Sequence, residues 1–231
     1  MKRQCVWSPT EIEGGDYVCD FNYPTISEMV DRIQDTNDEG RATAPRSVFF
    51  YTNLREPTDA EYEEVEKAME KAMNGKKIGR VKWAVHGAWI ASWMKAKNID
   101  HYSAFDAIKT TWKVRQGSWV EEWTDYMENP DDPKPYGGSY NIFKNCFLQA
   151  VAFAAINPDA YLFTTKGQNW DPRSVWATVE YWMLTTNPNI QRIHRVDPTP
   201  GACDSGELLW ERGRDEQVAP GMTSWICPVQ G

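Results

Sequence analysis

The chain has 231 residues, enough for one large domain or for two small lobes with a substantial core. It carries 25 Lys and Arg against 33 Asp and Glu, a net charge of −8, and the scattered basic residues argue against a nucleic-acid surface. No apolar run is long enough to span a membrane, and the first residues, MKRQC, lack the apolar segment of a signal peptide. The 12 Trp exceed average usage several-fold; most Trp residues serve aromatic cores, although flat ligands also stack on them.

Helices dominate the predicted first half of the chain. SVFFYTN at 47–53 is a compact apolar run between two prolines and predicts a buried strand. Thr58 and Glu61 form the capping box of a helix whose apolar stripe includes Val65 and Met69. The apolar periodicity predicts helices over 25–36, 58–73, 80–97 and 103–113.

The second half mixes strands with helices. Residues 129–138 hold three Pro and two Gly, which fits either a hinge between lobes or a surface loop. Beyond them we expect helices over 139–156 and 204–212 and strands over 160–164, 190–196 and 223–227. Because helices separate the strands, parallel pairing is expected. We therefore predict a single α/β domain over 1–231, with a mainly helical lobe (1–135) and a lobe (136–231) that holds a small, mostly parallel sheet flanked by helices.

The five cysteines lie mostly at the two ends of the chain. Cys5 is near Cys19 and Cys203 is near Cys227, so two short disulfides would hold ends that otherwise fray. Four cysteines allow three pairings, and this one is preferred. The placement indicates an oxidising compartment and hence a secreted or extracellular protein. Cys146 lies in an apolar helical pattern and fits a small core residue better than a nucleophile.

Glu180 is an acid in an aromatic setting, with Trp176, Tyr181 and Trp182 close to it in sequence. Desolvating a carboxylate is costly, and active-site acids are often found in such settings. The plain alternative is a glutamate that faces solvent from a half-buried strand. In parallel sheets, ligands bind beyond the carboxyl ends of the strands, where Glu180 and the TTKG turn at 164–167 would lie.

Several common chemistries lack their sequence motifs. The three histidines, His86, His101 and His194, show neither HExxH nor paired-cysteine spacing, so we expect no metal. GxGxxG, GxxxxGK(S/T) and GxSxG are absent, which argues against dinucleotide redox chemistry, nucleoside triphosphate hydrolysis and serine hydrolysis. Glycosidic cleavage by paired carboxylates stays open, because Glu180 has candidate partners.

FAAINPDAYLFTTKG at 153–167, followed by SVWATVE at 174–180, resembles a segment of the animal ADP-ribosyl cyclases and NAD glycohydrolases. In that family an aromatic helix with an FAxxA-like segment leads to a strand, a glycine turn and TFGSVE, whose last residue is the catalytic glutamate. Glu180 falls on that glutamate. The resemblance lies in arrangement more than identity and covers most of the chain, thinly in its middle. The cysteine pairs at both ends are placed like two of the family's disulfides.

The resemblance also implies substrate-binding residues. FFYT at 49–52 is similar to the family's LLWS, which places Tyr51 on the nicotinamide-stacking Trp and Thr52 on a phosphate-contacting Ser. The chain departs from the pattern here, because Tyr replaces Trp and the following Arg becomes Asn53. In the SVWATVE segment, Val175 replaces the Thr before the aromatic residue, now Trp176.

Two further positions follow from the resemblance. Phe143 is assigned to the second pocket Trp, with Tyr140 and Phe147 as alternatives on the same predicted helix. The SAFD segment resembles the family's TLED, and Asp106 keeps the family's interval to Trp119.

The resemblance implies a secreted hydrolase that takes NAD as substrate, needs no cofactor, and gives nicotinamide and ADP-ribose, with some cyclic ADP-ribose. Nicotinamide leaves as a neutral molecule, so Glu180 would stabilise an oxocarbenium-like ribosyl centre, while Tyr51, Trp176 and Phe143 hold the flat ring. Alternatives are a catalytically inactive secreted binding or effector module on the same scaffold, or a glycosidase. A homodimer is left open.

Overall fold

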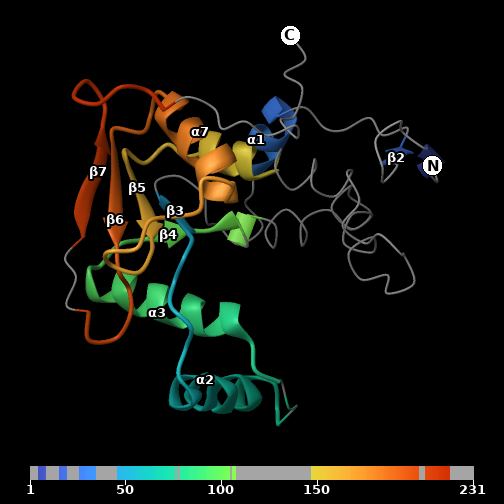
Figure 1. Cartoon of the computed structure of the whole chain (residues 1–231), viewed down its shortest axis with the longest axis vertical. Coiled ribbons are helices and arrows are strands. Elements are labelled where there is room, and N and C mark those ends of the chain that lie inside the picture. The colour runs from blue at the N-terminus through green and yellow to red at the C-terminus, as the bar shows by residue number, and fades with distance from the viewer. Residues whose placement is uncertain are drawn as a thin grey trace.

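The computed structural model describes residues 5–8, 16–19, 26–34, 46–75, 77, 79–104, 106–107, 147–202 and 206–218. At its centre is a five-stranded sheet with the strand order β4-β3-β5-β6-β7. The neighbours β4, β3, β5 and β6 pair in parallel, and β7 pairs antiparallel with β6 (Figure 1). The strands are β3 Ser47–Tyr51, β4 His101–Tyr102, β5 Asp159–Phe163, β6 Arg192–Val196 and β7 Glu207–Glu211. The fold class is therefore α/β with a mostly parallel sheet, as the sequence predicts.

Side chains alternate between two cores, one on each face of the sheet. On one face, Phe50, Leu162 and Ile193 pack with α1 (Ile26–Gln34), the helical residues 147–153 and α7 (Tyr181–Thr186). On the other face, Phe163 and Val196 pack against α3 (Lys82–Ala96). Because successive strand residues point to opposite faces, helices on both sides can each bury an apolar surface (Figure 1). The described part of the chain is thus a helix–sheet–helix arrangement.

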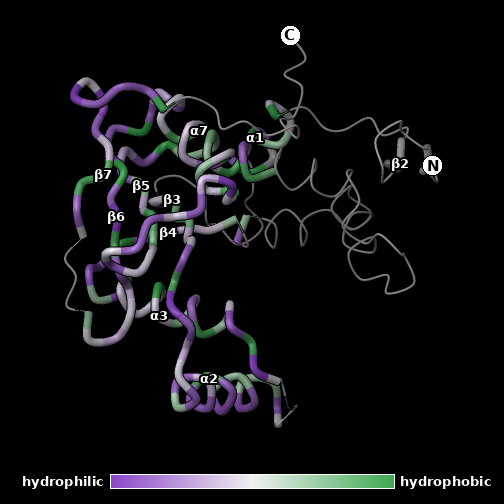
Figure 2. The backbone as a smooth tube through the Cα atoms, viewed as in Figure 1, coloured by the Kyte–Doolittle hydropathy of each residue, from purple (hydrophilic) through white to green (hydrophobic). Residues whose placement is uncertain are grey.

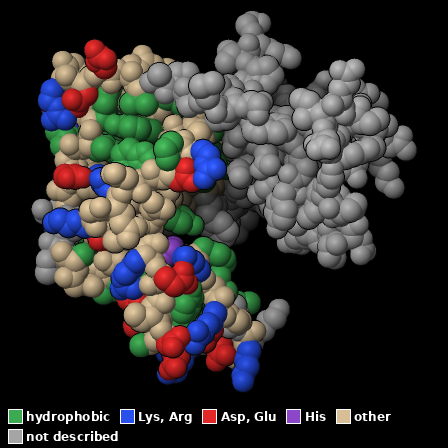
Figure 3. Space-filling model, viewed as in Figure 1, with side chains coloured by type: hydrophobic (Ala, Val, Ile, Leu, Met, Phe, Trp, Pro, Cys, Tyr) green, Lys and Arg blue, Asp and Glu red, His purple; other side chains and the backbone are tan. Residues whose placement is uncertain are grey.

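Helix α2 (Asp59–Ala72) lies outside this arrangement and packs on α3, away from the sheet (Figure 1). Its contact with α3 is a small cluster of Tyr62, Val85 and Trp89, with Val65 beside it. The rest of its surface is hydrophilic, with acidic and basic side chains interspersed (Figures 2 and 3). The predicted capping box is confirmed, because Thr58 accepts from the Glu61 amide and the Glu61 carboxylate accepts from the Thr58 amide.

Most predicted elements in the described ranges are confirmed. The helices over 25–36, 58–73 and 80–97 and the strands over 47–53, 160–164 and 190–196 correspond to α1, α2, α3, β3, β5 and β6. Of the helix predicted over 139–156, the structure describes residues 147–156, of which 147–153 are helical and 154–156 are not. Of the helix predicted over 103–113, residues 104, 106 and 107 are helical and residue 103 is not. The segments 129–138 and 223–227 lie outside the described residues, as do Cys146, Cys203 and Cys227.

The helix predicted over 204–212 is wrong, because this segment contains strand β7. Its apolar run LLW fits a helix by local pattern, but the free edge of β6 provides backbone partners that decide the outcome. Trp210 pairs with Ile193 and is buried in the core. Gly206 precedes the strand with φ +83°, and a Cβ there would lie 2.9 Å from the Val196 side chain, so the turn needs glycine.

The predicted boundary between the lobes, at 135/136, lies outside the described residues. Strands from both sides of that boundary share one sheet, since β3 and β4 come from 1–135 and β5, β6 and β7 from 136–231. The division into a helical lobe and a sheet lobe stays a prediction.

Asn187 closes the end of the helix over 147–153. Its side chain is 0% exposed, and its amide donates to the carbonyls of Ala152, Phe153 and Ala155 at 3.0, 3.1 and 2.8 Å.

We expect Asn187→Ala to cost roughly 2–4 kcal/mol of unfolding free energy, because buried carbonyls lose their donor. Asn187→Asp should cost at least as much, since it turns a carboxylate toward the same carbonyls. Ser92→Ala, on the exposed side of α3, is the control and should change stability little in denaturant titrations.

A second prediction concerns the amino-terminal hairpin, β1 (Cys5–Ser8) and β2 (Asp16–Cys19). The two strands pair antiparallel, and the register sets Cys5 directly opposite Cys19. Directly opposed residues of antiparallel strands have Cα atoms about 4.5–5.5 Å apart, a separation that a disulfide can span. Non-reducing peptide mapping should therefore recover a 5–19 bridge, with 203–227 as the second. A bridge between Cys146 and any of these four cysteines would contradict the pairing that contains that cysteine and would weaken the resemblance to the family.

Candidate functional site

The parallel strands bring three chain segments to one edge of the sheet. β3, β5 and β6 end there at Tyr51, Phe163 and Val196, which share one parallel register. The loops continue the pairing: the Thr52 amide donates to the Phe163 carbonyl at 3.0 Å, and the Thr164 amide to the Val196 carbonyl at 2.9 Å. Ligands of open α/β sheets bind beyond this carboxyl edge.

Glu180 reaches the same edge from a π-helical turn, η1 (Trp176–Glu180), which runs directly into α7. The Tyr181 amide donates to the Trp176 carbonyl, the i to i+5 pattern of a π-helix. η1 packs on β3, where the rings of Phe50 and Trp176 lie 6.2 Å apart. Glu180 is only 7% exposed, so the alternative interpretation, a glutamate that faces solvent, is wrong. Single π turns inside helices are frequent at functional sites.

Tyr51, the last residue of β3, lies within electrostatic range of Glu180, and its ring packs beside His86 of α3. Tyr51 is 46% exposed, so one part of its ring is open to solvent and another is covered. Burial of the covered part and the negative charge of Glu180 both raise the pKa of the Tyr51 phenol. The phenol therefore stays protonated at neutral pH, and this edge of the sheet carries a partly exposed aromatic ring and a nearly buried carboxylate.

Trp176 is placed differently from its predicted role. Its side chain is 1% exposed and stacks on Tyr181, with ring centroids 4.9 Å apart and planes at 15°. Trp170 meets the same two rings edge-on. A ring this deep in the core offers no open face to a ligand, so in this conformation Trp176 supports η1 and does not line a wall. Its indole Nε1 is buried and has no hydrogen-bond partner among the residues that the structure describes.

Thr52 and Asn53 lie just past β3, on the loop that borders Tyr51. Asn53 has a left-handed backbone, φ 49°, and its side-chain amide donates to the Asn169 carbonyl at 2.6 Å. Its own carbonyl accepts from the Thr165 amide at 3.4 Å. Asn53 thus links the loop after β3 to the loop after β5. The resemblance, in which an Arg stands at this position, did not predict this structural role.

Asp106 lies four residues after β4, whose last residue, Tyr102, pairs with Val48 near the start of β3. Its carboxylate accepts from the Ser103 amide at 2.9 Å and the Ser103 hydroxyl at 2.8 Å, as in a capping box. Phe143, Tyr140 and Trp119 lie outside the described residues, and Phe147 is a buried core residue. The second pocket aromatic and the role of Asp106 stay predictions.

Sequence reasoning missed the side chains that hold these loops. Asp197, directly after β6, accepts from the Lys166 amide at 2.7 Å and from the Thr199 amide and hydroxyl. Thr165 accepts from the Arg55 amide at 2.7 Å. The DPT triplet at 197–199 is an Asx-turn signal that could have identified Asp197.

Sequence reasoning also missed the ion pair between Arg55 and Glu61. The Arg55 guanidinium donates to both Glu61 oxygens, at 2.9 and 2.6 Å, and lies 4.5 Å from the ring centroid of Trp89. This bidentate pair lowers the pKa of Glu61 to about 2, against the opposing effect of burial. The pair anchors the loop after β3 to α2.

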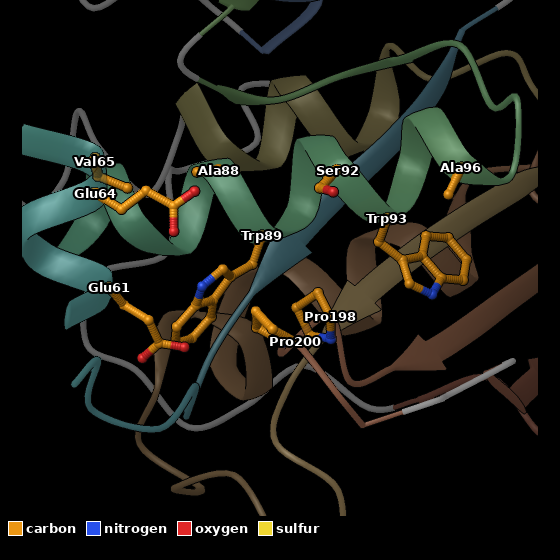
Figure 4. A pocket seen from close by; sticks show the side chains of 10 residues that line it. All are labelled: Glu61, Glu64, Val65, Ala88, Trp89, Ser92, Trp93, Ala96, Pro198 and Pro200. Atoms are coloured by element: carbon orange, nitrogen blue, oxygen red, sulfur yellow. The ribbon is translucent and has the colours of Figure 1, made fainter. Parts of the chain in front are cut away.

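A cavity of about 350 Å³ lies on the far side of this loop, between α2, α3 and the residues after β6 (Figure 4). It is lined by Glu61, Glu64, Val65, Ala88, Trp89, Ser92, Trp93, Ala96, Pro198 and Pro200. None of the predicted site residues lines it, and α3 packs on the sheet face opposite to η1. The cavity is therefore distinct from the edge that carries Glu180.

Comparison of the chain with protein-family models, curated proteins and solved structures finds no match. Among the residues that the structure describes, no helix has the length and apolar character needed to cross a bilayer. Within the same residues, no three metal-ligating side chains are grouped. A function must therefore be inferred from the geometry and chemistry of the site.

The pairing of Tyr51 with Glu180 can be tested without any substrate. Glu180→Gln removes the negative charge, so we expect the pKa of Tyr51 to fall while staying above its ordinary value, because burial persists. Tyrosine labelled with ¹³C at Cζ reports this by NMR titration, with Tyr51→Phe identifying the signal. Glu64→Gln, on the exposed face of α2, should leave it unchanged. An unshifted Tyr51 in Glu180→Gln would show that the two groups are uncoupled.

Proposed function

We propose that the chain is a distant member of the ADP-ribosyl cyclase and NAD glycohydrolase family, a secreted enzyme that cleaves the nicotinamide–ribose bond of NAD. One observation carries the proposal: a nearly buried carboxylate, Glu180, acts electrostatically on the half-exposed Tyr51 at the carboxyl edge of a parallel sheet. Active-site acids are found in such settings. The order of strand, glycine turn and terminal glutamate, which resembles that family, supports it.

The proposed reaction suits a single carboxylate. When the bond between the ribose C1 and the pyridinium nitrogen breaks, its electron pair stays on the nitrogen, and nicotinamide leaves neutral without a proton donor. The ribosyl centre left behind is oxocarbenium-like, and the negative charge of Glu180 would stabilise it. Water is partly excluded around Glu180, which strengthens the effect of a fixed charge.

Tyr51 would hold the departing ring. Its exposed face can stack on the nicotinamide, and before cleavage the positive charge of the pyridinium adds a cation–π attraction. Water attack on the ribosyl C1 then gives ADP-ribose and releases one proton. If the adenine folds back and attacks instead, the cyclic product forms. We propose hydrolysis as the main outcome, with NAD as substrate and without a cofactor.

A second candidate is an inactive binding module on the same scaffold. Two observations favour it: Trp176 is enclosed in the core, and the side chain of Asn53 is engaged with the Asn169 carbonyl. Such a module would bind a flat cationic ligand at Tyr51 without cleaving it.

We predict that Glu180→Gln lowers NAD turnover at least about a hundredfold, because it removes a preorganised charge from the transition state. Nicotinamide release and product identity are measured by chromatography after incubation with NAD. Circular dichroism checks that the variant is folded.

Glu64→Gln is the matched control, an identical substitution on the exposed surface of α2, and should keep full activity. A folded Glu180→Gln protein that releases nicotinamide at the parental rate would refute the assignment. A parent protein that binds NAD but releases no nicotinamide would favour the binding module, and turnover of oligosaccharides instead of NAD would favour a glycosidase.

A further inference from the structure

Behind Tyr51 stands a buried histidine that the proposed chemistry does not use. The His86 side chain, on α3, is 5% exposed, and its ring meets Tyr51 nearly perpendicularly, with centroids 6.1 Å apart at 76°. On its other side lies Trp89, with centroids 5.3 Å apart. His86 is therefore enclosed between a core indole and the ring that forms the proposed substrate wall.

One hydrogen bond fixes the tautomer of this imidazole. Its Nε2 lies 3.0 Å from the backbone carbonyl of Arg55. A carbonyl can only accept, so Nε2 carries a proton, and the neutral ring is then unprotonated at Nδ1. Protonation of Nδ1 would place a full positive charge directly behind Tyr51.

Charged groups surround His86 from the elements packed against it. Lys82, one turn earlier on α3, forms an ion pair with Glu56, and Arg55 forms one with Glu61 of α2. Burial lowers the pKa of His86 most, and the positive charges of Lys82 and Arg55 lower it further. The bond to the Arg55 carbonyl and the charge of Glu56 act in the opposite direction. At neutral pH, His86 is accordingly uncharged.

We propose that His86 is a positioning and specificity-determining residue for Tyr51: its neutral ring supports Tyr51 edge-on and keeps the wall selective for a permanently cationic aromatic ring. This inference rests on the proposed function, because it takes Tyr51 as the substrate wall. It narrows the substrate class to N-alkylated pyridinium compounds over their neutral analogues. A charged His86 would repel such a cation across Tyr51 but would leave a neutral ring of the same shape almost unaffected.

The sign of the pH effect follows from the lowered pKa of His86. Affinity for the cation is highest above pH 6.5, the ordinary pKa of histidine, and decreases as the pH falls through the lower pKa of His86 in the folded protein. We expect a loss of roughly threefold to tenfold for a charge repulsion at this separation near a protein surface.

The experiment compares two ligands that differ mainly in charge. One is N-methylnicotinamide methylated on the ring nitrogen, which is a pyridinium cation, and the other is nicotinamide, which is neutral. Binding of each to the full chain is measured by calorimetry or ligand-observed NMR across the acidic and neutral pH range. Variants are His86→Gln, whose amide can still donate to the Arg55 carbonyl, and His194→Gln as control. His194 bonds Asp159 at the start of β5, at the opposite edge of the sheet. With three histidines in the chain, these variants also assign the His86 NMR signal.

In the parent and in His194→Gln, we expect the affinity for the cation to fall as His86 becomes protonated. In His86→Gln, the affinity for the cation should not change over that pH range. The affinity for nicotinamide should stay the same in all three proteins. Equal pH dependence in His86→Gln, equal loss for both ligands, or no binding of N-methylnicotinamide at neutral pH would overturn the proposal. If His86→Gln does not fold, the Tyr51 ¹³Cζ signal of the parent decides: it must shift with the His86 titration. Failure of the proposed function would give a different result: the protein would not cleave NAD, but its binding of the cation would still depend on the protonation of His86.

Discussion

The parallel register of β3, β5 and β6 is the constraint on which the candidate site depends. It sets Tyr51 beside Phe163 and Phe163 beside Val196, so three loops far apart in sequence leave the sheet at one edge. Parallel strands need crossover helices, and each crossover helix starts at that same edge. The topology therefore brings Glu180, at the junction of η1 and α7, to the edge at which β3 ends, although many residues separate the two in the chain.

The π turn determines how Glu180 arrives. Five residues in a wider turn bring Trp176 and Tyr181 into line, which is why their rings stack at 4.9 Å; in an α-helix, residues five apart point in different directions. Trp176 fills the core below, and Glu180, at the end of the same turn, remains at the edge with a small exposed fraction. The aromatic residues around this acid thus act mainly as its support.

The sequence predicts this structure where local chemistry decides. The T-x-x-E capping box fixes the start of α2, and an apolar run between prolines identifies β3. β7 could not be read in the same way, because LLW suits a helix until the open edge of β6 supplies its partners. For the site, an acid in an aromatic context identifies Glu180. The burial of Trp176 and the contact of His86 with Tyr51 depend on the π turn and on the packing of α3 against β3, neither of which leaves a signal in spacing.

Charge distribution at the edge bears on which ligand it suits. Arg55 and Lys82, the cations nearest to His86, are paired with Glu61 and Glu56, so they add little net positive charge beside Tyr51. Glu180 adds a negative charge there, which favours a cationic ring over a neutral or anionic one. Lys166 projects from the loop after β5 with an exposed side chain, on a backbone held by Asp197. A cationic ring would complement Glu180 and an anionic group would complement Lys166, whereas a neutral sugar chain would use neither charge.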